Sequence, residues 1–120
     1  MVIVRQHGEA GQLFDIPSLL ADVDSFFRTD QWQISVESCL GSNALSVEEA
    51  SFSGLSLSDS EFRSLYSGIY QTIDGRFCGF GEGQRLFELL VVDSSYWEVT
   101  GTPAFEAHIL ATYGAWVQSQ

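Results

Sequence analysis

Two histidines and two cysteines are the side chains of this sequence best suited to catalysis or metal binding. They are His7, His108, Cys39 and Cys78. Nucleophilic catalysis needs a hydroxyl or thiol within hydrogen-bond reach of a base, and no Ser or Cys stands next to either histidine. Metal sites are commonly recognised from ligand pairs spaced C-x-x-C or H-x-x-x-H, and neither spacing occurs. The sequence therefore predicts no catalytic residue, no metal and no cofactor.

A glycine-rich stretch, Gly79–Gly83, invites comparison with phosphate-binding loops. Such loops present backbone N–H groups at the start of a helix and usually carry a lysine. Here a strand-like segment follows the glycines, Glu82 lies among them, and the sequence contains no lysine. We interpret the stretch as the turn of a β-hairpin. Adjacent carboxylates such as Glu48 and Glu49 are interpreted as solvated surface, because neighbouring residues do not share a helix face.

Charge is the most informative property of the composition. Five arginines face sixteen aspartates and glutamates, which gives a formal net charge of −11. Folding does not require such a surplus, since like charges repel one another in the compact state. Phosphate contacts draw on Lys and Arg, so the charge argues against nucleic acid and against an anionic membrane surface as partners. A basic protein is the partner that this charge favours.

Patterns in the sequence predict three helices. Apolar residues between Ile16 and Phe27 recur at helical spacing. Ser58 and Glu61 form a capping-box pattern ahead of a second, short helix that ends near Gly68. A third helix is expected from Pro103, with Thr102 as its cap. The apolar stripe of this last helix consists of Phe105, Ile109, Tyr113 and Trp116.

Strands are predicted from period-two alternation and from turn residues. The clearest is Trp32–Leu40, in which apolar and polar side chains alternate. A less regular strand is expected over Leu45–Leu57, and Asp74-Gly75 is interpreted as a tight turn. The remaining predicted strands are Val2–Val4, Phe77–Phe80, Leu86–Val92 and Tyr96–Thr100, with Asp93-Ser94-Ser95 as the turn before the last.

Together these elements predict an α+β fold in a single domain, residues 1–120. Strands joined by tight turns pair antiparallel, so we expect a sheet of about five to six strands with three helices packed on one face or end. Cys39 and Cys78 lie far apart in strand-like segments and are expected to be free, buried thiols. No signal peptide or membrane span is recognised, which predicts a cytoplasmic protein.

The last predicted helix is unusually apolar. Between Pro103 and Val117 only Glu106 and His108 can carry charge. A helix that is apolar nearly all round is either buried on several sides or in contact with another chain. Burial within the domain and a homodimer contact through Pro103 to Val117 are both consistent with this pattern.

One segment has the composition of an interface. Asp93-Ser94-Ser95-Tyr96-Trp97-Glu98-Val99 places acids, hydroxyls and two large aromatics together at the end of the sheet. The alternative interpretation is that Trp97 fills the core while Tyr96 and Glu98 face water. This segment, a strand ending in Asp-Ser-Ser followed by an aromatic and Glu, resembles segments of the immunity proteins that bacteria carry beside polymorphic or contact-dependent toxins.

The resemblance implies a small, acidic, cytoplasmic α+β protein that binds and neutralises a basic toxin domain, with a nuclease as one such toxin. Complementary charge would accelerate the encounter, and a few desolvated anchors would supply the affinity. The acids and the aromatic near predicted turns are the candidate partner-binding residues: Asp74, Glu82, Asp93, Tyr96 and Glu98. The alternatives are a dimeric chaperone of the type III secretion kind and, third, a small hydrolase-like enzyme that uses His7 or His108.

Overall fold

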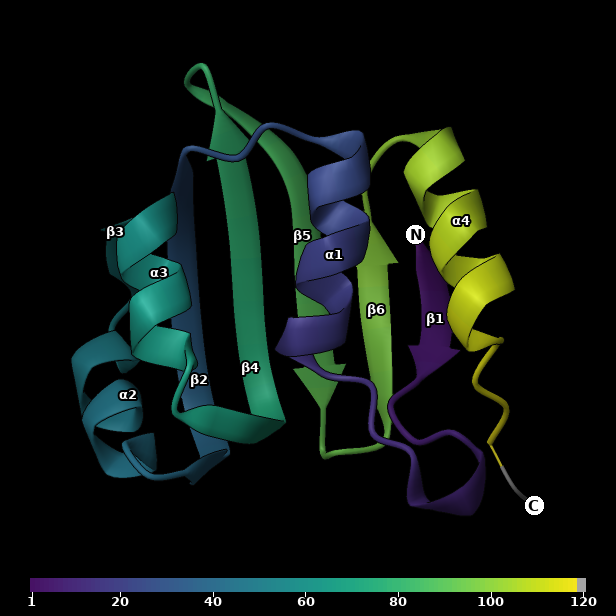
Figure 1. Ribbon diagram of the computed structural model, residues 1–120, viewed down its shortest axis with the longest axis horizontal. Coiled ribbons are helices and arrows are strands. Elements are labelled where there is room, and N and C mark those ends of the chain that lie inside the picture. Colours follow the sequence, from purple (N-terminus) through teal and green to yellow (C-terminus); the bar gives the residue numbers. More distant parts are fainter. Residues whose placement is uncertain (119–120) are drawn as a thin grey trace.

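The computed structural model describes residues 1–118 and contains one six-stranded, fully antiparallel sheet (Figure 1). The strand order is β1-β6-β5-β4-β2-β3. The predicted α+β class and the sheet of five to six strands are confirmed. The strands are β1 (Val2–Arg5), β2 (Gln31–Gly41), β3 (Leu55–Ser58), β4 (Ile69–Gly81), β5 (Gln84–Val92) and β6 (Tyr96–Thr100).

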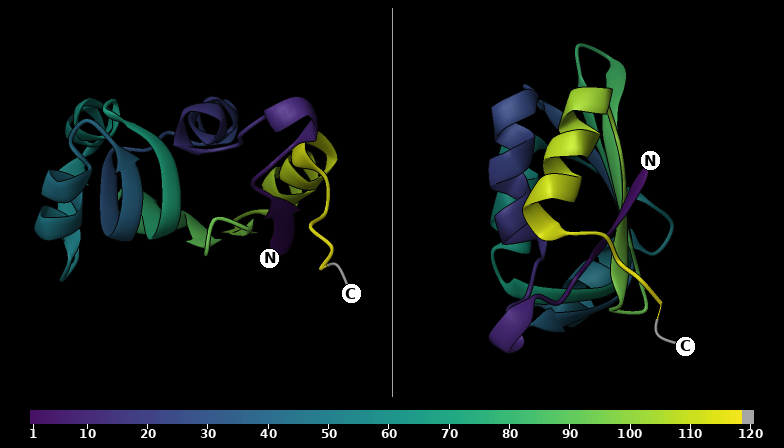
Figure 2. Two further views of the ribbon diagram at one scale, coloured as in Figure 1. Left: turned by 90° about the horizontal axis from the view of Figure 1, so that it is seen from below. Right: turned by 90° about the vertical axis from the view of Figure 1, so that its right-hand side faces the viewer.

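Helices cover one face of this sheet and leave the other face open (Figure 2). Trp32 of β2 stacks on Phe62 of α3 at 4.2 Å between ring centroids, and Phe87 of β5 contacts Phe105 of α4. Trp32, Phe62 and Phe105 are completely buried, so the core lies between the helices and this face. The helices are α1 (Ile16–Phe26), α2 (Ala44–Ser51), α3 (Asp59–Tyr66) and α4 (Pro103–Tyr113), with a short 3-10 turn, η1 (Glu9–Gly11).

The helix start signals in the sequence behave as predicted. Ser58 Oγ accepts a hydrogen bond from the Glu61 N–H, and a carboxylate oxygen of Glu61 accepts one from the Ser58 N–H at 2.8 Å. These two bonds form the capping box of α3. Thr102 caps α4, and Pro103 occupies its first turn. The helix ends at Tyr113, where Gly114 has a positive φ, so Trp116 lies in the extended segment beyond the helix. No helix within residues 1–118 is long and apolar enough to cross a membrane.

The prediction of a strand over Leu45–Leu57 is wrong, and the structure has four helices where three were expected. The segment forms α2 and only then the short strand β3. The reason lies in β2, which is longer than its neighbour β3. Where β3 is absent, Ser51 Oγ accepts the Val36 N–H at 3.0 Å and Glu48 accepts the Cys39 N–H at 3.0 Å. Two side chains of α2 thus replace a strand partner along this part of β2.

The prediction of a turn at Asp74-Gly75 is also wrong. Both residues lie inside β4, which pairs with β2 through register shifts between Val36 and Cys39. Gly75 is buried there, and a Cβ at this position would come within 2.9 Å of the Thr72 methyl group and 3.2 Å of the Phe77 ring, so close packing explains the glycine. By contrast, the Gly79–Gly83 hairpin and the turn after Val92 are confirmed.

Candidate functional site

Four of the five predicted partner-binding residues lie in the region of the β5–β6 turn. Asp74 accepts the Asp93 backbone N–H at 2.8 Å, so these two acids stand side by side. Tyr96 and Glu98 alternate along β6 with the buried Trp97 and therefore point to the open face. Glu82 is separate from them, because it occupies the β4–β5 turn at the other end of β5 (Figure 1).

The aromatic residues of this segment divide between core and surface. Trp97 is completely buried, and its indole N–H donates to the Phe14 carbonyl at 2.9 Å, so it is not available to a partner. The alternative interpretation, in which Trp97 fills the core, is the one that the structure supports. Tyr96 is half-buried against Trp116, with ring centroids 4.4 Å apart. The surface offered here is consequently acidic but carries no strongly exposed aromatic anchor.

His7 lies beside Ser94. Both residues line a hollow of about 470 Å³, together with Arg5 and Trp116. Its Nε2 atom is 2.8 Å from the Ser94 carbonyl oxygen and 3.4 Å from the Ser94 hydroxyl. When Nε2 carries the proton that the carbonyl accepts, it cannot also remove a proton from the hydroxyl. That hydroxyl already accepts a hydrogen bond from Gln71 at 2.7 Å.

His108 joins α4 to α1. Its Nε2 atom is 2.7 Å from a carboxylate oxygen of Asp22, and the Tyr113 hydroxyl donates to the other oxygen of the same carboxylate. The nearest hydroxyl, that of Thr112, is 3.4 Å from the same Nε2. A catalytic triad divides the two ring nitrogens between carboxylate and nucleophile, whereas here one nitrogen meets both. Burial, followed by the Asp22 carboxylate, raises the pKa of Tyr113, which fixes it as a donor.

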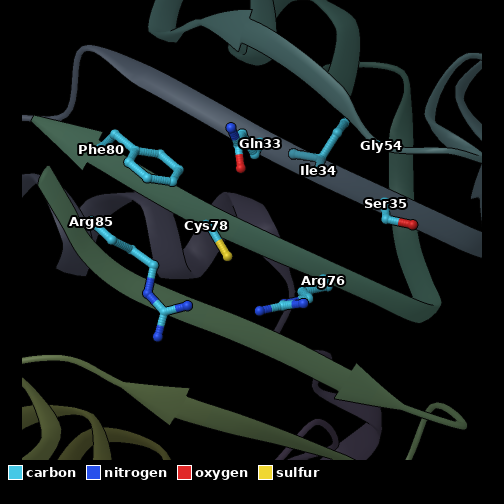
Figure 3. Close-up of a pocket in the computed structure, with 8 residues that line it drawn as sticks. All are labelled: Gln33, Ile34, Ser35, Gly54, Arg76, Cys78, Phe80 and Arg85. Carbon is cyan, nitrogen blue, oxygen red and sulfur yellow. The ribbon is translucent and has the colours of Figure 1, made fainter. Parts of the chain in front are cut away.

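The open face carries a shallow hollow of about 220 Å³ over β2, β4 and β5 (Figure 3). Arg76 and Arg85, two of the five arginines, line it with Cys78. Glu88 neutralises part of their charge: it accepts from Arg76 Nε at 2.6 Å and lies 3.6 Å from Arg85. These two arginines thus lie on the open face, and neither lines the hollow beside α2.

The most interface-like surface is one that the sequence did not predict. We call it the α2 surface; it is a hollow of about 670 Å³ lined by Val36, Glu37, Leu45, Glu48, Glu49 and Phe52. Phe52 is 82% exposed and Leu45 67% exposed, although both are large apolar side chains. Three carboxylates surround them, and none of the residues lining the hollow is basic.

This surface was missed because its residues were assigned to a strand. In a strand, Leu45 and Phe52, which are seven residues apart, would point to opposite faces of the sheet and would not form one patch. The available signal was helical: Val47 and Ser51, four residues apart, are the buried positions of α2, whereas Leu45, Ser46 and Glu49 are exposed.

A buried polar cluster holds the covered face together and is structural. Asp15 caps α1 through the Ile16 N–H at 2.8 Å and accepts the Thr72 N–H of β4 at 2.8 Å. Gln6 donates to the same carboxylate at 2.9 Å. Burial is the main influence on Asp15 and raises its pKa, while the hydrogen bonds from Thr72 and Ile16 oppose that shift.

No protein-family model, curated protein or solved structure matches this chain. Within residues 1–118, no group of three or more His, Cys, Asp and Glu side chains is placed to hold a metal ion. The surface and its charges are therefore the basis for inferring a function.

Proposed function

We propose that this protein is an acidic protein-binding module that docks a basic protein partner on its α2 surface. The observation that carries the proposal is the pair Leu45 and Phe52, exposed together and surrounded by Glu37, Glu48 and Glu49. Single exposed apolar side chains are common on proteins, but two that line one hollow make a patch typical of interaction sites.

The chemistry of the surface defines the partner. Apolar anchors that become desolvated supply most of the affinity of an interface, and a charged rim supplies steering and discrimination. The rim is anionic, so the partner must present apolar side chains flanked by Lys or Arg. A domain that acts on an anionic substrate carries the basic part of such a surface.

This argument agrees with the resemblance to immunity proteins, and we extend the proposal accordingly. The partner is a toxin domain, and binding neutralises it in the cytoplasm of the cell that makes both. The predicted acids Asp93 and Glu98 would belong to a secondary contact or to long-range steering, because they lie in the β5–β6 turn and on β6. Asp74 pairs with Ser38 of β2, next to Glu37, and would lie nearer the α2 surface.

The direct test is co-expression with the protein encoded by the neighbouring gene in the genome of origin. The wild-type chain should restore growth and bind that protein. The double variant Leu45→Ser/Phe52→Ser should bind about 30-fold more weakly or worse, as expected when central anchors are removed. Because both side chains are exposed, the variant should unfold at the wild-type temperature.

A matched control is Val117→Ser, which removes an apolar side chain that is 80% exposed but lies beyond α4. This variant should bind like the wild type. If the two α2 substitutions leave both binding and growth rescue unchanged, the α2 surface is not the interface. If the wild-type chain does not rescue growth, the immunity function itself is wrong.

A dimeric secretion chaperone is the second candidate, and α4 is the observation that favours it. The helix buries Phe105, Ile109 and Tyr113, while Leu110 on its outer side is 40% exposed beside several alanines. A homodimer contact would cover this side. The molar mass in solution separates the two functions, because a stable dimer favours the chaperone and a monomer favours the inhibitor.

The third candidate, an enzyme, depends on the two histidines. The double variant His7→Gln/His108→Gln should retain full growth rescue if the protein acts by binding alone. Loss of rescue with the fold and the binding affinity intact would show that an imidazole takes part in chemistry.

A further inference from the structure

The two edges of the sheet are treated differently. At one edge, the segment after α4 runs along β1: the Trp116 N–H donates to the Ile3 carbonyl at 3.0 Å, and Val4 pairs with Ala115. At the other edge, β3 pairs with β2 on one side only. Edge strands are usually protected by charged side chains or proline, and β3 is the uncharged sequence Leu-Ser-Leu-Ser.

Hydrogen-bond alternation shows which groups of β3 are free. The Asp59 N–H donates to the Asp30 carbonyl at 3.0 Å. Given the register of β2 and β3, Leu57 and Leu55 are then the residues bonded to β2, while Ser56 and Ser58 direct their backbone groups outward. The capping box already uses the Ser58 N–H. The N–H and C=O of Ser56, which is exposed, therefore face solvent.

An apolar hollow lies next to this free backbone. Leu55 and Leu57 pair with Ile34 and Trp32, which are buried, so their side chains share the helix-covered face. With Leu65 of α3 they line a hollow of about 530 Å³. An edge strand beside a helix with such a hollow between them is the arrangement that accepts an added strand.

We infer that β3 is a docking edge for an extended segment of a partner protein, with apolar side chains at alternate positions and basic side chains between them. The Ser56 backbone would pair with the segment, and one apolar side chain would enter the hollow of Leu55, Leu57 and Leu65. Glu61 lines the hollow, which favours a basic segment. A second copy fits poorly, because pairing β3 with itself would bring together two chains of charge −11.

The probe is a short capped peptide of alternating valine and lysine, and the control is the same sequence with every backbone amide N-methylated. Both have the same charge, but only the first can form a strand ladder. We expect the unmethylated peptide to bind at least about tenfold more tightly, because N-methylation removes the N–H that would donate to the Ser56 carbonyl and its methyl groups keep the peptide from approaching the edge strand. Its binding should slow hydrogen exchange at the Ser56 amide.

Two protein variants complete the test. Ser56→Pro removes the outward N–H, which would donate to a peptide carbonyl, and should weaken binding of the unmethylated peptide several-fold, whereas Ser56→Ala keeps the N–H and the affinity. If Ser56→Pro does not fold, the test is hydrogen exchange of the Ser56 amide in the wild-type protein, measured with and without the unmethylated peptide. The double variant Leu45→Ser/Phe52→Ser should still bind the peptide, which separates this inference from the proposed α2 interface.

The inference is overturned by equal affinity for the two peptides, which would indicate attraction by charge alone. It is also overturned by unchanged exchange at Ser56, or by a dimer of the protein that Ser56→Pro dissociates. In the last case the occupant of the edge is a second copy.

Discussion

Asp15 is the residue whose ionisation is most tightly tied to the fold. It is nearly fully buried and receives backbone N–H groups from both α1 and β4. The nearest side chains with which it bonds, Gln6 and Thr72, are neutral, so hydrogen bonds rather than a counter-charge support the carboxylate. Such a group makes stability depend on pH in a predictable direction.

We expect Asp15→Asn to destabilise the protein by about 1–3 kcal/mol, because either orientation of the amide leaves one backbone N–H unpaired. Burial raises the pKa of Asp15 in the folded state. Its protonation therefore favours the fold: this contribution is complete below the unfolded pKa and is lost as pH rises through the folded pKa. The stability gap between wild type and variant should widen as pH falls from 7 towards 4. Urea unfolding at a series of pH values measures this gap, and a gap that narrows would contradict the prediction.

The two thiols should be poorly reactive in the folded protein. Burial, then the nearby Glu48 carboxylate, raises the pKa of Cys39 to about 11. Burial and Glu88 raise the pKa of Cys78 as well. Near pH 8 the Cys39 thiolate should be about a hundredfold scarcer than that of an unperturbed thiol. A thiolate of higher pKa is also more nucleophilic, so its reaction with a disulfide reagent should be slower by roughly ten- to a hundredfold. Reaction in urea gives the unperturbed rate, and Cys39→Ala assigns the slow phase. Equal rates with and without urea would refute this expectation.

At the scale of elements, sequence patterns correctly predicted the helix caps and strands that depend on neighbouring residues. The capping box at Ser58, the cap at Thr102 and the alternation of Trp32–Leu40 all correspond to observed elements. The segment Leu45–Leu57 was mispredicted because its secondary structure depends on a neighbouring strand, β2, and not on its own sequence alone. Unpaired N–H groups of β2 need acceptors, and α2 supplies them from Ser51 and Glu48. That error concealed the α2 surface. Asp93 was found because the β5–β6 turn is visible locally, whereas Asp74 was chosen from a turn that the structure replaces with strand β4.

Ser51→Ala tests this account of α2. Ser51 is completely buried, and its hydroxyl accepts the Val36 N–H while donating to the Val47 carbonyl at 2.7 Å. Alanine should leave the Val36 N–H without a partner and lower the free energy of unfolding by about 1–3 kcal/mol. Ser46→Ala, at an exposed position of the same helix, should change it by no more than about 0.5 kcal/mol. Chemical denaturation measures the free energy of unfolding of both variants. Equal effects of the two substitutions would contradict the explanation that α2 forms because Ser51 pairs with β2.

At the scale of the whole molecule, charge and fold are separable. Apart from Asp15, the core within residues 1–118 is built from neutral side chains. The other acids are exposed or half-buried, and five acids but only one arginine lie between Gln31 and Tyr66. The surplus charge therefore serves solubility or a partner rather than packing.

Removing charge from the α2 surface should accordingly stabilise the protein while weakening its binding. Glu37 and Glu49 are exposed, and neither makes a hydrogen bond or ion pair within residues 1–118, so Glu37→Gln/Glu49→Gln removes two repelling charges and no contact. The melting temperature of the variant should rise at about 0.02 M salt and approach the wild-type value at about 0.5 M, where the screening length is only a few ångströms. The affinity for the basic partner should fall at low salt and converge with that of the wild type at high salt. Thermal unfolding and calorimetric titration at both salt concentrations decide the matter. A variant that is less stable at low salt would mean that these carboxylates support the fold after all, and unchanged binding would mean that they do not face the partner.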